Sequence, residues 1–210
     1  MYLSQLLLDR RNPSVIQSLR NCHDMHRTIM KAFPEHGTDQ ARKEFGVLYR
    51  VLFQNTSIWL YVLSEQKPDW PRIFQNGYIA KGCKDISGVK NAFREGRSFL
   101  FDILLQPSKK LSRPDGNSRR VTIGEPEERE QWLQRKARES GFRLEWYREE
   151  GKRKISGYHS TDRGGPLHLD AIRYRGVLTI EDDEKFINAY RSGIGPGKAY
   201  GLGMLLLAKA

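Results

Sequence analysis

A segment of five glycines near the C-terminal end places the tightest limit on how this chain can fold. Residues 191–208 read RSGIGPGKAYGLGMLLLA, with glycine at five positions and a proline among them. Glycine adds backbone freedom and proline lacks an amide donor, so neither a helix nor a regular central strand can run through such a segment. The sequence therefore predicts a shaped loop that leads into a short apolar strand at 204–208.

Lys198 lies in the middle of this glycine loop. Backbone amides that no Cβ shields, together with one mobile ammonium, suit a phosphate chain, and we expect Gly195, Gly197 and Lys198 to contact a polyanion. The loop is not a nucleotide-binding P-loop, because Lys198 is followed by Ala199 and Tyr200 and the run precedes a strand. A tight helix-to-strand connection without any ligand is the alternative reading.

The net charge of the chain supports the prediction that it binds a polyanion. The net charge is +11 on 210 residues and the pI is about 9.7, which favours nucleic acid or an anionic membrane over acidic protein partners. No window approaches the roughly 18 apolar residues of a spanning helix, and the first apolar run is too short for a secretory signal. We therefore expect no membrane association, a cytoplasmic location and reduced thiols at Cys22 and Cys83.

The order of predicted elements repeats once along the chain. We predict two ferredoxin-like (RRM-like) β-α-β-β-α-β domains, an α+β fold, at 1–88 and 97–210, joined by a weakly patterned connection over 84–96. In the first domain we expect strands at 2–8, 47–53, 58–63 and 78–81, one helix over 13–33 and a short helical piece after Asp69. In the second we expect strands at 98–106, 142–148, 172–180 and 204–208, with helices at 125–140 and 182–192.

The predicted helix over 13–33 carries the best candidate chemistry. His26 falls on its apolar stripe, and His23, Arg27 and Lys31 line the neighbouring arc. Histidine acts as acid or base near neutral pH, while nearby cations favour its neutral form and attract phosphate. This pattern suits a metal-independent ribonuclease. A packed core histidine is the plain alternative, and a zinc site on Cys22, His23 and His26 would need a fourth ligand from elsewhere.

Two further stretches combine basic residues with turn signals. Residues 109–120 (KKLSRPDGNSRR) should form an exposed positive loop, and residues 151–166 interleave cations with Tyr158 and His159. Both suit contact with an RNA backbone and its bases, although each alone could be a solvated loop. The candidate RNA-binding residues of these stretches are Lys109, Lys110, Arg113, Arg119, Arg120, Lys152, Arg153, Lys154, Tyr158, His159 and Arg163.

Four segments together resemble the CasE family, the CRISPR-associated endoribonucleases of the type I-E Cascade complex. They are the N-terminal MYLSQLLL, the MHRTIMKAFP of the predicted helix, LLQPSKKL before a basic loop, and the C-terminal GIGPGKAYGLGMLLLA. The resemblance spans nearly the whole chain. It implies tandem ferredoxin-like domains that recognise the stem-loop of each CRISPR repeat in precursor RNA and cut at the base of the stem.

The resemblance also implies a mechanism, a site and partners. Cleavage would need no metal or other cofactor: the ribose 2′-hydroxyl attacks the adjacent phosphate and leaves a 2′,3′-cyclic phosphate and a 5′-hydroxyl. The family's catalytic histidine corresponds to His26, and His23 stands where some relatives have tyrosine. The segment around Tyr158 and His159 corresponds to a hairpin that enters the RNA groove. The enzyme would stay on the mature crRNA beside other Cascade subunits.

Composition alone leaves two other classes of function open. A non-catalytic RNA-binding module built from tandem ferredoxin-like domains would have the same charge and element order. A purely structural subunit of a ribonucleoprotein is the third reading, because a nuclease that remains on its product also acts as a scaffold.

Overall fold

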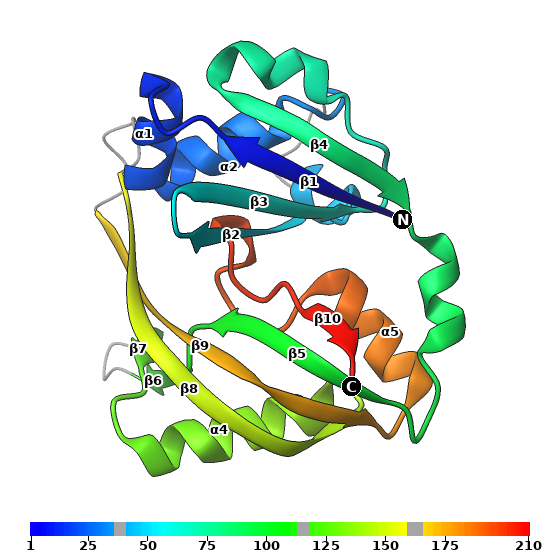
Figure 1. Ribbon diagram of the computed structural model, residues 1–210. Helices are drawn as coiled ribbons and strands as arrows, with labels where there is room; N and C mark the ends of the chain where they lie inside the picture. The colour runs from blue at the N-terminus through cyan, green and yellow to red at the C-terminus, as the bar shows by residue number, and fades with distance from the viewer. Residues whose placement is uncertain (36–40, 113–117, 159–165) are drawn as a thin grey trace.

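The computed structural model describes residues 1–35, 41–112, 118–158 and 166–210. Two four-stranded antiparallel sheets dominate it, and Figure 1 shows one above the other with the C-terminal glycine loop running between them. The first sheet has the order β2-β3-β1-β4 and the second β10-β5-β9-β8. Counted along each half of the chain, both orders are 4-1-3-2, so the predicted tandem ferredoxin-like fold is confirmed.

The first sheet is built from β1 (Tyr2–Leu8), β2 (Leu48–Gln54), β3 (Ser57–Ser64) and β4 (Tyr78–Asp85). The short helical piece expected after Asp69 is the 3-10 helix η1 (Trp70–Asn76), and the connection between the sheets contains η2 (Ser87–Ala92). The strand expected at 78–81 extends to Asp85, where β4 pairs with β1 along its whole length.

The single helix expected over 13–33 is wrong: the segment forms two helices, α1 (Pro13–Arg20) and α2 (Cys22–Met30). Asn21 between them has extended backbone angles, φ −128° and ψ 107°. Its side chain accepts a hydrogen bond from the amide of His23, so this residue ends the first helix and caps the second. A short helix α3 (Ala41–Glu44) follows before β2.

The second sheet contains β5 (Ser98–Leu105), β8 (Phe142–Gly157), β9 (Leu167–Ile180) and β10 (Leu206–Lys209), and its helices are α4 (Pro126–Glu139) and α5 (Asp183–Ser192). Strands β8 and β9 are much longer than the expected 142–148 and 172–180. Residues 151–157 of the basic segment therefore belong to β8 and do not form the solvated loop that was the alternative reading. The closing strand begins at Leu206, two residues later than predicted.

The basic stretch 109–120 also differs from the expected loop, because it forms a hairpin. Strand β6 (Ser108–Ser112) pairs antiparallel with β7 (Ser118–Thr122), and Lys110 stands opposite Arg120. Neither strand joins the large sheets, and Figure 1 places the hairpin beside β8 and β9.

The cores of the two halves lie close together. Side chains of α4, α5, β5 and β9 form the larger core, which includes Trp132, Phe186 and Tyr174 and also takes in Leu48 and Leu63 of the first sheet. The second core packs α1 and α2 on the first sheet. No helix in the described part of the chain is long and apolar enough to cross a membrane.

Candidate nucleic-acid interface and catalytic site

One asparagine side chain positions the helix that carries the two histidines. Asn21 Oδ1 accepts from the amide of Tyr158 at 3.1 Å, and Asn21 Nδ2 donates to the carbonyl of Tyr158 at 3.3 Å. Tyr158 directly follows β8, so the start of α2 is tied to the far end of the long strand. The side chain of Tyr158 is 60% exposed beside this junction, where it is free to meet a ligand.

His26 lines a broad groove of about 1080 Å³, which we call the histidine groove. The predicted cations Arg27 and Lys31 line the same groove, together with Arg72. The Nδ1 atom of His26 is buried and makes no hydrogen bond to any described residue. Burial, reinforced by the charges of Arg42 and His23, lowers the pKa of His26 to about 4. The ring is therefore neutral at physiological pH and can accept a proton.

His23 lies between a strand and the glycine loop. Its ring meets that of Tyr200 edge to face, with centroids 5.0 Å apart and an interplanar angle of 78°. Gly157 at the end of β8 approaches it from another direction: a Cβ there would lie 2.7 Å from His23 Cδ2 and 2.6 Å from Cys22 Sγ. Strand β8 packs directly against α2 because position 157 has no side chain.

The glycine loop presents the ring of Tyr200 toward His23. A single 3-10 turn, η3 (Lys198–Tyr200), is bounded by Gly197 and Gly201, both with left-handed backbone angles. The hydroxyl of Tyr49 donates to the carbonyl of Ala199 at 3.1 Å and fixes the turn on β2. A Cβ on Gly197 would lie 2.6 Å from Leu202 Cδ1, so the loop's own packing explains this glycine. The RNA contact of Gly195 and Gly197 stays a prediction.

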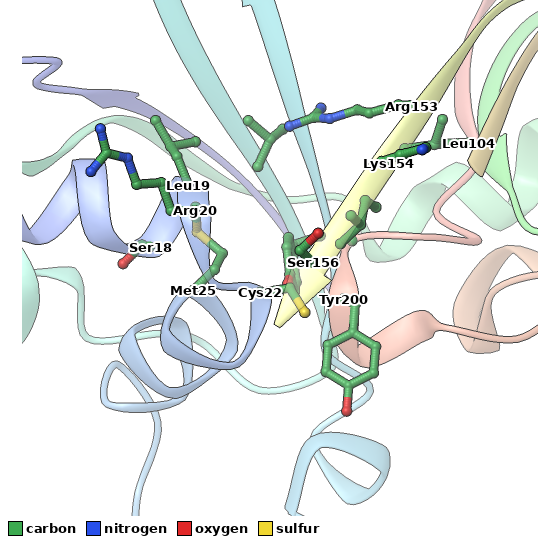
Figure 2. Close-up of a pocket in the computed structure, with 14 residues that line it drawn as sticks. Ser18, Leu19, Arg20, Cys22, Met25, Leu104, Arg153, Lys154, Ser156 and Tyr200 are labelled. Atoms are coloured by element: carbon green, nitrogen blue, oxygen red, sulfur yellow. The ribbon is translucent and has the colours of Figure 1, made fainter. Parts of the chain in front are cut away.

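A cavity of about 140 Å³ lies behind α2, and we call it the cysteine cavity. Figure 2 shows Cys22, Ser156 and Met25 around it, with the ring of Tyr200 pointing away from it. Burial raises the pKa of the Cys22 thiol to about 11. Cys22 lines this cavity while His26 lines the histidine groove, so the residues of the zinc alternative are directed to different places.

A second groove, about 760 Å³ in volume, gathers the cations of several elements, and we call it the basic groove. Seven basic residues line it against one acid, Glu139. Four of them were predicted from the sequence, and three on α4 and α5 were not. The seven are Lys109, Lys110, Arg120, Lys198, Arg135, Lys136 and Lys185.

Some of these cations are already paired. Lys109 Nζ lies 2.6 Å from Glu128, and Arg120 donates to the hydroxyl of Ser108 at 3.0 Å. Burial lowers the pKa of Lys198, and the charges of Arg42 and Lys136 lower it further. Lys198 therefore lies in the basic groove within the field of Arg42, whose charge also acts on His26.

The predicted basic residues of 151–166 divide between positions. Lys152 and Lys154 are exposed on β8, whereas Arg153 is half-buried and stacks over the ring of Phe53, 4.5 Å from its centroid. Arg113, His159 and Arg163 lie outside the described residues. Arg119 is placed only by its backbone in β7, where it pairs with Leu111.

Three residues of the histidine region were missed by the sequence reasoning: Tyr200, Arg42 and Arg72. Tyr200 was read only as a departure from the P-loop pattern, and Arg42 gave no signal because its surroundings resemble a solvated helix. Arg42 Nη1 donates to the carbonyl of Val47 at 3.0 Å, which holds the guanidinium half-buried. Its charge lowers the pKa of both His26 and Lys198.

Known proteins are similar to this chain in sequence and in fold. The family described as "CRISPR associated protein" matches residues 1–209. The chain is 29% identical to CRISPR-associated endoribonuclease Cse3 of Thermus thermophilus, over 99% of this chain and 100% of that protein. It is 30% identical to Cascade subunit CasE of Escherichia coli, over 99% of both. A structure of Cse3 bound to a 19-nucleotide RNA is similar with a TM-score of 0.83, at 27% identity over 99% of this chain and 100% of the other.

Proposed function

The chain belongs to the family of CRISPR-associated proteins, and on this premise we propose that it is an endoribonuclease that cuts the repeat stem-loops of precursor CRISPR RNA. Position and protonation of His26 carry the proposal: a neutral imidazole lies in a cation-lined groove, on a fold shared with an RNA-bound endoribonuclease. The partners we propose are the repeat stem-loop, the mature crRNA and the other subunits of a Cascade complex.

The reaction follows from a neutral base beside bound phosphate. His26 takes the proton from a ribose 2′-hydroxyl, whose oxygen attacks the adjacent phosphorus. The bond from phosphorus to the 5′-oxygen breaks, which leaves a 2′,3′-cyclic phosphate on one fragment. The departing 5′-oxygen takes up a proton and becomes a hydroxyl. We assign the donation of this proton to His23, next to His26 on one helix.

The cations bind and orient the RNA. Arg27 and Lys31 line the groove with His26 and can contact phosphates next to the cut. The basic groove, with Lys110, Arg120 and Lys198, would hold the backbone further along. Arg42 adds positive charge where the phosphate becomes more negative during attack. We further propose that residues 1–88 supply the catalytic helix and residues 97–210 most of the RNA contacts, and that the protein acts in the cytoplasm.

An all-ribose stem-loop, a 2′-deoxy stem-loop and the variant His26→Ala together test the proposed endoribonuclease function. Wild-type protein in EDTA should cut a repeat stem-loop once, at the base of the stem, and leave a 2′,3′-cyclic phosphate. His26→Ala should lose about 10² to 10⁴ in single-turnover rate while binding RNA within a few-fold. A stem-loop with a 2′-deoxyribose at the cut position should bind and stay intact. Cleavage of this deoxy RNA would show that the 2′-hydroxyl is not the nucleophile.

A further inference from the structure

A fourth hollow lies between β2 and β8, outside the histidine and basic grooves. Its volume is about 240 Å³, and four cations line it against one acid, Glu150. We call it the arginine cavity; its cations are Arg50, Lys152, Arg153 and Arg173. It shares Val51, Leu104 and Arg153 with the cysteine cavity, so the two adjoin. Figure 2 shows Arg153 reaching from β8 toward the strands of the first sheet.

Arg50 is the unusual member of this cavity. The residue is only 2% exposed, and its Nη2 donates to Asp102 Oδ1 at 3.1 Å. Its Nε and Nη1 are buried and have no hydrogen-bond partner among the described residues. Burial lowers the pKa of Arg50 to about 10, so the guanidinium keeps its charge at neutral pH. Buried donors left unsatisfied are costly, and an anion in the cavity would remove that cost.

The acids nearby do not neutralise the cavity. Asp102 is already shared, because Arg173 Nε donates to both of its oxygens, at 3.1 and 3.0 Å. Glu150 interacts with Arg175 at 3.2 Å and with Arg173 at 3.5 Å. Lys152 and Arg153 form no ion pair with a described residue. The cavity therefore keeps an excess of positive charge that its own carboxylates do not balance.

An aromatic side chain stands at the edge of the same cavity. Phe53 lies near the end of β2, is 56% exposed and lines the cavity. The guanidinium of Arg153 covers its ring at 4.5 Å. A stacked arginine and an exposed ring are the groups on which proteins stack the bases of unpaired nucleotides.

We propose that the arginine cavity binds one unpaired nucleotide, with its base stacked on Phe53 and Arg153 and its phosphate held by Arg50, Lys152 and Arg173. The main ligand we propose is a nucleotide that flanks the RNA stem, and this part of the inference rests on the proposed function. A free mononucleotide has the same chemistry and is the other source. Bases paired within a stem are excluded, because both of their faces are already stacked.

Binding measurements with RNAs that cannot be cleaved distinguish a flanking nucleotide from a free mononucleotide as the ligand. Each RNA carries a 2′-deoxyribose at the cut position, and three forms are compared: the bare stem-loop, one with about five unpaired nucleotides on the 5′ side, and one with the same extension on the 3′ side. Adenosine 5′-monophosphate is titrated separately. The variants are Phe53→Ala, the exposed cation variant Lys152→Ala, and Phe74→Ala as the control. Phe74 is a 45% exposed phenylalanine of η1 that does not line the arginine cavity.

We expect Phe53→Ala to raise the Kd of one extended RNA about tenfold and to leave the bare stem-loop unchanged. Lys152→Ala should flatten the salt dependence for the same RNA only. Phe74→Ala should match wild type throughout. Binding of the mononucleotide to wild type but not to Phe53→Ala, with no effect of either extension, would support the cavity and identify a free nucleotide as its ligand.

Two results would overturn the proposal. One is an unchanged Kd of Phe53→Ala for every RNA and for the mononucleotide. The other is equal weakening of the bare and the extended RNAs, which would place Phe53 against the stem. Neither depends on cleavage, since the RNAs stay intact. Failure of the endoribonuclease function would instead appear as wild-type protein that leaves an all-ribose stem-loop uncut.

Discussion

The ring of His23 meets the ring of Tyr200 edge to face, at 5.0 Å between centroids, although the two residues lie on α2 and on the glycine loop. Edge-to-face pairs hold both rings in a preferred orientation. The contact therefore connects the most unusual segment of the sequence to the helix that carries the histidines. Through this contact the glycine loop orients the imidazole of His23, in addition to the RNA contact predicted for the loop.

Tyr200 should act on cleavage through the position of His23. Tyr200→Phe keeps the ring contact and should retain single-turnover cleavage within about threefold of wild type, whereas Tyr200→Ala should lose about ten- to a hundredfold because the imidazole is no longer held. RNA affinity should change less than the rate. Equal rates for Tyr200→Ala and wild type would remove this contact from the mechanism.

The low pKa of His26 predicts an unusual pH dependence. The base must be neutral, so the rate at subsaturating RNA should fall only as the pH drops through about 4, well below the ordinary histidine value of about 6.5. Arg42→Met removes a charge that lowers this pKa, and its midpoint should move upward toward 6.5. The pH–rate profile measures both midpoints.

Arg72→Met is the matched control for this shift. Arg72 lines the same groove but forms an ion pair with Asp69 at 2.9 Å, and its charge is not among those that lower the pKa of His26. Its profile should keep the wild-type midpoint. A midpoint that stays in place in Arg42→Met, or that moves equally in both variants, would contradict the role of the Arg42 charge.

The sequence predicted the fold class because strand and helix periodicities are local signals. It failed at Asn21, because the apolar positions on both sides of the break stay in phase and hide the boundary; the signal was the preference of asparagine for helix caps. It also ended β8 too early. Register shifts between Leu144 and Trp146 and between Glu149 and Lys152 interrupt the alternation that marks a strand.

The candidate site was predictable to the extent that it lies on one helix. His23, His26, Arg27 and Lys31 are near neighbours in the sequence, so their shared surface followed from helical spacing. Tyr200, Arg42 and Arg50 reach their places through the packing of distant segments. No short-range pattern distinguishes a buried arginine such as Arg50 from an exposed one.

The basic groove should account for much of the salt dependence of RNA binding. Replacing Lys110, Arg120 and Lys198 together with alanine should lower the slope of log Kd against log salt by about 2 to 3. Each phosphate contact that is lost reduces the number of counterions released when RNA binds. The control replaces Lys67, Lys81 and Lys84, which are exposed and do not line the groove. Equal slopes for the two triple variants would place the RNA on another face.

The last prediction concerns how the glycine loop keeps its shape. Gly201 has φ +80°, and a Cβ there would lie 2.8 Å from Tyr49 Cε2. Gly201→Ala should displace the ring whose hydroxyl holds Ala199, lower the melting temperature by several degrees and slow cleavage, because Tyr200 moves with the turn. Gly82→Ala is the control, since no atom lies within 4 Å of its Cβ position. A Gly201→Ala protein that melts and cuts like Gly82→Ala would show that the fit between Gly201 and Tyr49 does not position the turn.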